Sequence, residues 1–365
     1  MIIATIILIL LAVLAAANGA NDVSKGVATL RGSGLAPYRT AILWGAVTTL
    51  AGSLLSAALA HNMLKVFTGG AITQPPTLGF EAAVLLGVIA WVGAATVLRL
   101  PVSTTHALIG GLIGAALLFA PHAIAWSALF YRLLVPLLVS IFVAFAISAL
   151  ASYIGRLISR DRAGAPSPGS HSLFGPDGLH WLSAGGVGFA RGLNDTPKIV
   201  SLGVAIPNID VIWLFVLVAA AMFVGSLIAG SRVAKVLAED LITMNHREGL
   251  TANLTTAVLV GFGANLGLPM STTHVSTGAI VGIGGSQAQR LNKATIVKLL
   301  LAWTVTPLVA GTVAALAYLA IAWGPERAAW SLPVRLSAVV ATAIVAAIIV
   351  IVLRNRRRQE EVAVS

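Results

Sequence analysis

The sequence predicts an all-α integral membrane protein that contains two copies of one unit. Three observations lead to this prediction: an apolar composition, repeated apolar stretches of membrane-spanning length, and two polar motifs that each occur twice in the same order. Of the 365 residues, 58% are hydrophobic and 10% are charged, against about 25% charged in ordinary globular proteins. Because so few charges cannot coat a soluble body of this size, we expect the chain to lie in a lipid bilayer.

The composition also excludes several classes of function. The chain has no cysteine, which rules out disulfides, thiolate metal sites and iron–sulfur clusters. The net charge of +11 could suggest nucleic acid as a partner, but the basic residues form short clusters between apolar runs. That distribution is typical of the cytoplasmic loops of membrane proteins. The sequence also lacks a Gly-x-Ser-Gly nucleophile turn and a His-Glu-x-x-His metal motif, so we do not expect an enzyme.

Apolar stretches along the chain predict about 10–12 spans, since a helix needs about 20 apolar residues to cross the hydrocarbon core. The uninterrupted stretches are 38–60, 80–99, 127–155, 209–231, 250–268, 296–323 and 333–353. The short or polar-interrupted stretches are 2–30, broken at Asn18–Asp22, 102–120, 179–205, broken at Asn194 and Asp195, and 272–285. The predicted architecture is therefore a bundle that includes discontinuous helices.

Two features define the predicted organisation of the chain. Residues 1–17 could be a cleaved signal peptide, but they contain no basic n-region and a polar cluster follows directly, so we interpret them as a retained first membrane segment. Residues 156–180 are rich in Arg, Pro, Gly and Ser and predict an aqueous linker, cytoplasmic because it begins with basic residues. We therefore expect a first membrane repeat at 1–155 and a second at 181–365, in a multi-pass protein of the cell membrane.

An internal repeat is carried by two motifs. Residues 17–27 align with residues 190–200, sharing Ala, Gly, Asn, Asp, Lys and Val positions. Later in each half, Pro101-Val-Ser-Thr-Thr-His106 matches Pro269-Met-Ser-Thr-Thr-His274, and the Asp-to-Pro separations are 79 and 74 residues. Two motifs in the same order at similar spacing indicate a duplicated unit.

The Asn-Asp motif predicts a cation site. Asp22 and Asp195 lie in apolar segments, where an ionised group costs at least about 2.5–3.5 kcal/mol at the bilayer centre. The neighbouring Asn21 and Asn194 amides, with carbonyls released where glycine lets the helix unwind, complete a hard oxygen site suited to Na⁺ or a proton. The alternative is that both motifs only cap helices at the membrane surface.

The Ser-Thr-Thr-His motif predicts an anion site. Proline ends one segment, and a hydroxyl residue at the N-cap opens the next helix. A helix N-terminus at membrane depth offers free N–H groups and a positive dipole end, and adjacent hydroxyls add donors for an oxyanion. Two such tips could grip a tetrahedral anion between them. The alternative is ordinary capping of a broken helix.

Six further side chains have weaker predicted roles. Lys25 and Lys198 each follow an Asp residue by one helical turn. They could be ion partners of that Asp, attract an anion, or extend their side chains to the membrane interface. We expect His106 and His274 to bond locally and fix the turn, with proton transfer as the second interpretation. The remaining pair, Glu81 and Glu248, precede the two Pro positions by 20 and 21 residues, and we expect them at the level of the lipid headgroups.

With these residues the chain resembles the inorganic phosphate transporter (PiT) family of sodium- or proton-coupled phosphate symporters. The resemblance implies two repeats of inverted topology, discontinuous helices and hairpins, with phosphate held near the midplane by the hydroxyl tips. It places cations at Asn21, Asp22, Asn194 and Asp195, with Na⁺ as the metal. The phosphate-binding residues that it implies are Ser103, Thr104, Thr105, Ser271, Thr272 and Thr273, with Lys25, Lys198, His106 and His274 as secondary contributors.

The resemblance predicts a secondary active transporter that carries inorganic phosphate with Na⁺ or H⁺, and a sulfate or other oxyanion permease is the alternative within the family. An anion channel is less consistent with the sequence, because Asp22 and Asp195 would hinder passage of an anion. The expected partners are phosphate, the coupling ion and the bilayer, with a homodimer as a further candidate; we expect no cofactor and no nucleic acid. One departure from symmetry is that Arg191 stands where the first repeat has Asn18.

Overall fold

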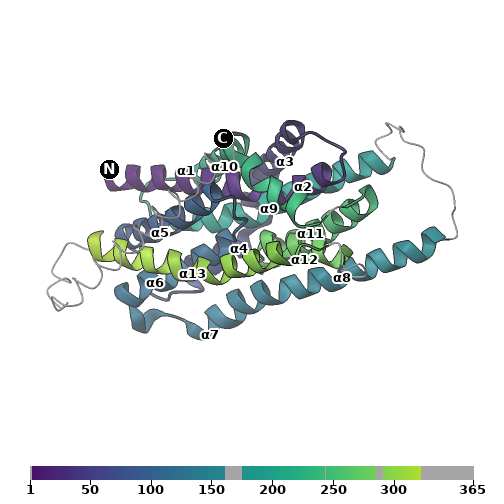
Figure 1. Cartoon of the computed structure of the whole chain (residues 1–365). Coiled ribbons are helices and arrows are strands. Elements are labelled where there is room, and N and C mark those ends of the chain that lie inside the picture. The colour runs from purple at the N-terminus through teal and green to yellow at the C-terminus, as the bar shows by residue number, and fades with distance from the viewer. Residues whose placement is uncertain (1, 161–174, 243, 285–290, 322–365) are drawn as a thin grey trace, which may run out of the picture.

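The structure is a computed structural model that describes residues 2–160, 175–242, 244–284 and 291–321 (Figure 1). The apolar stretch predicted at 333–353 lies outside the described residues, as does residue 1. The described chain is helical almost throughout, in agreement with the predicted all-α class. An isolated bridge between Ile72 and Ile124 pairs two loops.

The helices of the first half are α1 (Ile2–Asp22), α2 (Ser24–Gly32), α3 (Tyr38–Leu59), α4 (His61–Gly69), α5 (Leu78–Val97), α6 (Thr104–Phe119), η1 (Pro121–Ala123), α7 (Trp126–Ala128), η2 (Leu129–Leu134) and α8 (Val135–Arg160). Those of the second half are α9 (Pro176–Val200), η3 (Ser201–Gly203), α10 (Val211–Lys235), η4 (Val236–Asp240), α11 (His246–Leu266), α12 (Thr272–Gly284) and α13 (Lys293–Ile321).

Six stretches of the described chain are helices long and apolar enough to cross a membrane: Ile2–Gly32, Tyr38–Leu59, Leu78–Val97, Trp126–Leu157, Val211–Asp240 and Lys293–Ile321. The other predicted apolar stretches within the described residues also form helices. α6 and α12 are short, at 16 and 13 residues, while α9 and α11 are long but more polar. The mixture of full-length and short helices is the discontinuous bundle that the sequence predicts.

The predicted breaks at the Asn-Asp motifs differ between the halves. In the first, α1 ends at Asp22 and α2 begins at Ser24, but Val23 between them keeps helical φ and ψ and its N–H bonds to the Gly19 carbonyl, so the predicted break is reduced to one irregular residue. In the second, the predicted break at Asn194 and Asp195 is wrong, because α9 continues to Val200 with Pro197 inside it. A proline inside a helix removes a backbone donor and crowds the preceding turn, yet α9 continues through Pro197, packed along α3.

The glycines of these motifs serve close packing rather than the predicted unwinding. A Cβ on Gly19 would lie 2.1 Å from the carbonyl oxygen of Met222, and one on Gly192 would lie 2.4 Å from that of Thr49. Each glycine therefore lets two backbones approach within the distance that any side chain would prevent. The expectation that these glycines let the helix unwind and free carbonyl ligands is therefore wrong.

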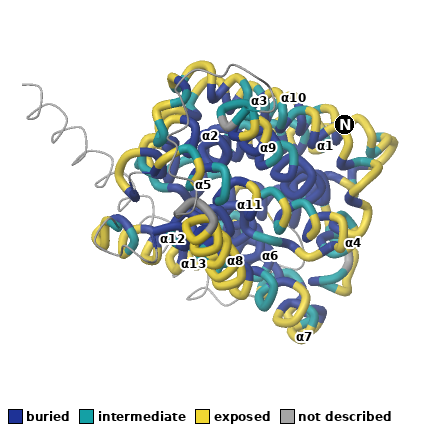
Figure 2. Tube along the Cα trace, turned by 90° about the vertical axis from the view of Figure 1, so that its right-hand side faces the viewer, coloured by how far each residue is buried: buried dark blue, intermediate teal, exposed yellow. Residues whose placement is uncertain are grey.

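The two halves interlock. The first half's α1 packs along α10 of the second half, α3 packs along α9, α8 packs along α12, and α13 packs along α5 and α6. Figure 2 shows buried segments inside the bundle and exposed ones around it. Large apolar side chains such as Phe142, Ile228 and Leu308 are exposed on the outside, where lipid replaces water as the surrounding medium.

The linker predicted at 156–180 is helical at both of its ends. α8 continues to Arg160 and α9 begins at Pro176, so only residues 161–175 separate them, and 161–174 lie outside the described chain. The repeat boundaries at 155 and 181 stay a prediction.

Candidate functional site

The centre of the candidate site is the side-chain amide of Asn18 near the end of α1. Its Nδ2 lies 3.2 Å from Asp22 Oδ2, 3.0 Å from Thr104 Oγ1 and 3.3 Å from Asp195 Oδ2. All four residues are at most 3% exposed. This one amide therefore joins the Asn-Asp motifs of both halves to the first hydroxyl tip, as the prediction of a shared site requires.

The two hydroxyl tips form helix starts as predicted. The Ser103 hydroxyl accepts the backbone N–H of His106 at 3.2 Å, and the Ser271 hydroxyl accepts that of His274 at 3.1 Å. Each serine thereby satisfies one of the backbone donors that a helix N-terminus leaves free. These bonds use the backbone N–H groups of the two histidines and not their rings, so local bonding by the His side chains and their role in proton transfer both stay predictions.

The tips also contact one another directly. The Thr105 hydroxyl donates to the carbonyl of Met270 at 3.4 Å, and the Thr273 hydroxyl donates to the carbonyl of Val102 at 2.8 Å. The rings of His106 and His274 lie with centroids 4.5 Å apart. Thr272, at the start of α12, is buried in the same region. The structure thus brings together the six hydroxyl residues of the sequence prediction.

The lysines of both motifs are ion partners of the aspartates. Lys25 pairs with Asp22 in a short contact, and Lys198 Nζ lies 3.4 Å from Asp195 Oδ1. Lys198 also donates to the Thr105 hydroxyl at 2.8 Å. Both lysines are 1% exposed, so the alternative in which they extend to the membrane interface is wrong.

Arg191 is a site residue that the sequence prediction left out. Its Nη2 lies 3.2 Å from Asn18 Oδ1, its Nη1 lies 3.3 Å from Thr49 Oγ1, and its Nε lies 4.0 Å from Asp195 Oδ2. The side chain is 1% exposed. Two signals in the sequence could have identified it: it occupies the position of Asn18 in the repeat, and an arginine within an apolar segment is rarely without function.

The asparagines adjacent to the aspartates brace the tips. The Asn21 amide donates to the Leu100 carbonyl at 2.9 Å, and its Oδ1 accepts the N–H of Val102 at 3.1 Å. Asn194 Nδ2 donates to the Met270 carbonyl at 2.9 Å and to Asp195 Oδ1 at 2.8 Å. Each asparagine therefore ties its motif to the residues just before a hydroxyl tip. Their predicted role as cation ligands remains untested.

The charge balance of the site favours an anion. Three buried cations, Lys25, Lys198 and Arg191, face two buried carboxylates, Asp22 and Asp195. Within the described chain, no group of three or more His, Cys, Asp or Glu side chains is placed to hold a metal ion. A cation bound here would therefore depend on amide, hydroxyl and carbonyl oxygens in addition to the two carboxylates.

Comparisons with known proteins agree with the two-repeat arrangement of the site. The sequence profile of the phosphate transporter family matches residues 18–169 and again residues 160–314, which confirms the repeat. A probable low-affinity inorganic phosphate transporter of Mycobacterium leprae is 28% identical over 313 residues, which cover 82% of this chain and 74% of that protein. A protein of the same description from Bacillus subtilis is 28% identical over 316 residues, 82% of this chain and 92% of its own.

A solved structure shares the fold. The protein titled "The sodium-dependent phosphate transporter" superposes with a TM-score of 0.76 over 88% of this chain and 99% of its own, at 19% sequence identity. The double profile match, the described helices long enough to cross a membrane and the shared fold together confirm the predicted resemblance. The chain belongs to the phosphate transporter family and is a multi-pass membrane transporter rather than an enzyme.

Proposed function

We propose that this chain carries inorganic phosphate across the cell membrane, that this transport is driven by a cation gradient, and that Na⁺ is the coupling ion. The observation that carries the proposal is the Asn18 amide, which bonds both aspartates and the first hydroxyl tip in one buried cluster. A binding site at the interface of two repeats is the arrangement that alternating access requires.

Phosphate binding in this proposal uses the hydroxyl tips and the lysines. The start of α6 and the start of α12 contribute backbone N–H groups and positive dipole ends. Lys198 already contacts Thr105 at 2.8 Å, so both groups can turn together toward an anion oxygen. The excess of one positive charge among the five buried ionic groups supports binding of an anion.

Cation binding follows from an exchange of partners. When Lys25 and Lys198 turn to phosphate, Asp22 and Asp195 lose their ammonium partners and need new ones, because an unpaired buried carboxylate is costly. With Asn21 and Asn194 beside them, the aspartates then suit Na⁺. Phosphate and cation would thus bind together more favourably than either alone. The structural relative is titled as sodium-dependent, which supports Na⁺. H⁺ is the second candidate, because a proton can also neutralise a buried carboxylate whose lysine partner has turned away.

Uptake by proteoliposomes tests this function. Purified protein is reconstituted, and radiolabelled phosphate uptake is measured under a Na⁺ gradient and under a proton gradient, with sulfate as the competitor. We expect concentrative, Na⁺-driven uptake that sulfate inhibits weakly. Asp195→Asn should abolish gradient-driven uptake, while the matched control Asp210→Asn, at the exposed N-cap of α10, should retain it. Downhill phosphate flux that ignores both gradients would indicate a channel and contradict the proposal.

A further inference from the structure

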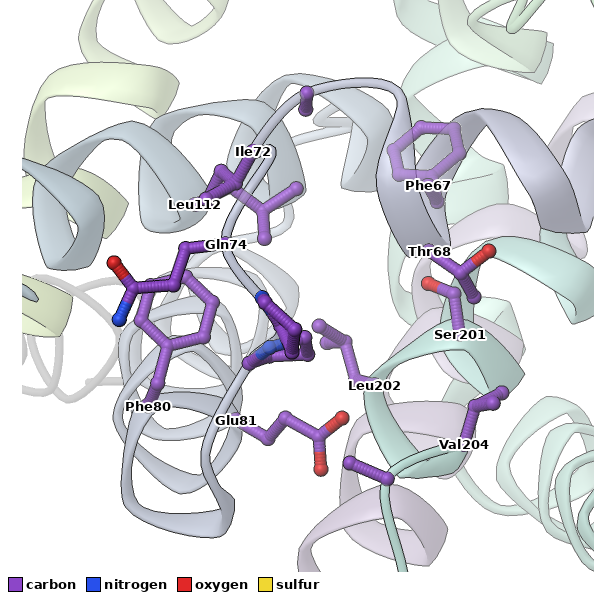
Figure 3. Close-up of a pocket in the computed structure, with 14 residues that line it drawn as sticks. Phe67, Thr68, Ile72, Gln74, Phe80, Glu81, Leu112, Ser201, Leu202 and Val204 are labelled. Carbon is purple, nitrogen blue, oxygen red and sulfur yellow. The ribbon is translucent and has the colours of Figure 1, made fainter. Parts of the chain in front are cut away.

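A cavity separate from the Asn18 cluster lies where α4, the start of α5 and η3 meet. It measures about 180 Å³, and most of its walls are apolar. Figure 3 shows its polar residues, which are Thr68, Gln74, Glu81 and Ser201. Glu81 sits in the first turn of α5.

Glu81 is buried in this cavity instead of being solvated at the headgroup level as the sequence suggested. Glu81 is 1% exposed, and Ala205 lines the same cavity. The carboxylate oxygen Oε2 of Glu81 is buried without a hydrogen-bond partner. Glu248, the equivalent residue of the second half, instead completes a capping box with Asn245. Only Glu81 of this pair therefore presents a free carboxylate oxygen to a cavity.

Among the residues that the structure describes, no charged partner lines the cavity with Glu81. The titratable side chains of α4, and of the helices packed against α5, are Asp22, His61, Lys65, His106, Arg232, Lys235, Lys293, Lys298 and Tyr318, and none of them is among the lining residues. The loop 70–77 and η3 contain no titratable residue. The last charged residue before η3 is Lys198, whose ammonium group is bonded to Thr105 and Asp195.

The surroundings of Glu81 suit a proton better than a metal ion. Hard cations take about six or more oxygen ligands at once, whereas a proton needs one free carboxylate oxygen. In Figure 3 the hydroxyls of Thr68 and Ser201 lie beside each other and apart from the carboxylate, and the Gln74 amide points away from it. An ionised carboxylate in a largely apolar cavity is unfavourable unless a positive charge neutralises it. Here a proton bound to Oε2 can neutralise it.

We propose that Glu81 is a proton-binding site of the transport cycle, distinct from the paired aspartates at the Asn18 cluster. The link to the transport site runs through η3, because the Ser201 hydroxyl donates to the Lys198 carbonyl at 2.7 Å. A movement of the end of α9 during transport would therefore move the cavity wall that η3 forms next to Glu81. Glu81 would bind a proton in one conformation and release it in the other. This inference rests on the proposed transport function for its role, but proton binding itself does not require transport.

Labelling with dicyclohexylcarbodiimide tests proton binding directly, since this apolar reagent reacts with protonated carboxyl groups in apolar surroundings. The purified full-length protein is labelled over a series of pH values with and without Na⁺, and the modified residue is located by peptide mass spectrometry. We expect labelling of Glu81 that declines as pH rises and that Na⁺ at constant pH leaves unchanged. Glu248 serves as the internal control and should stay unlabelled, and Glu81→Gln should remove the signal from its peptide.

Two labelling results would overturn the proposal: protection by Na⁺ at constant pH, which would indicate a metal site, and no labelling of Glu81 at any pH. Uptake supplies the second test. Glu81→Gln keeps the size of the side chain but binds no proton, so stimulation by an inward proton gradient should be lost while phosphate binding persists. Full stimulation in the variant, or none in the wild type, would refute a role in the cycle. If phosphate uptake itself is absent, the labelling result still decides whether Glu81 binds a proton.

Discussion

Replacing Thr104 by valine should weaken phosphate binding without disturbing the fold. The Thr104 hydroxyl accepts a hydrogen bond from the Asn18 amide at 3.0 Å, which uses its oxygen and leaves its own proton to donate to an anion. Valine keeps the shape and removes both bonds. Since the Asn18 bond is lost with and without substrate, it cancels, and the change in affinity equals the bond to phosphate alone.

The expected magnitude follows from the charge of that bond. A hydrogen bond to a charged group contributes about 1.5–3 kcal/mol, which corresponds to an increase of about 10- to 150-fold in the apparent KM for phosphate at 1.4 kcal/mol per factor of ten. The Asn18 amide retains Asp22 and Asp195 as acceptors, so the protein should insert and remain folded.

Initial rates of phosphate uptake by proteoliposomes, measured over a range of phosphate concentrations, give the KM. Thr304→Val is the matched control, because the exposed Thr304 hydroxyl donates to the Leu301 carbonyl within its own helix; its KM should equal that of the wild type. A KM for Thr104→Val that also equals that of the wild type would remove this hydroxyl from the anion site and refute the reasoning.

Two further predictions concern packing and charge. Gly19→Ala should lower the melting temperature of the detergent-solubilised protein, because its Cβ would lie 2.1 Å from the Met222 carbonyl oxygen, whereas Gly93→Ala, which meets nothing within 4 Å, should not; equal melting temperatures would show that α1 and α10 can separate at no cost. Lys198→Met should reduce phosphate uptake strongly, because it removes the ammonium group next to Asp195 and leaves that carboxylate with Arg191 as its only basic partner among the described residues. Retained uptake with unchanged KM would assign Lys198 a purely structural role.

The repeat predicted more of the site than any single motif did. Two copies of one unit place equivalent residues near a common axis, so the alignment of Asp22 with Asp195 and of the hydroxyl tips predicted which groups meet. The repeat did not predict how deeply individual side chains are buried. The spacing of Lys25 and Lys198 one turn after the aspartates is compatible with burial and with extension to the interface, and only the packing of neighbouring helices decides between them.

The glycines and Glu81 illustrate why the remaining features could not be predicted. Gly19 has the same local sequence whether the helix unwinds there or another helix packs against it, and the deciding residue, Met222, lies in the other half of the chain. Glu81 was predicted correctly at the start of a helix, but the elements that cover it, α4 and η3, are joined to it only by tertiary contacts. Arg191 was visible as a break in the repeat, yet its partners Asn18 and Thr49 are distant in sequence.

The interlocking of the two halves has a consequence for synthesis of the protein. Gly19 on α1 rests against Met222 on α10, and the ribosome makes α10 roughly 10–40 s after α1 at about 5–20 residues per second. During that interval Asn18 and Asp22 are already in or near the bilayer, while the partners Arg191 and Asp195 do not yet exist. The nascent first half must therefore shelter its polar residues, at the translocon or through the pairing of Asp22 with Lys25, until the second half arrives. A chain that stops before α9 lacks Arg191 and Asp195 and leaves those groups permanently unmatched, which makes it a substrate for membrane quality control rather than a half-active carrier.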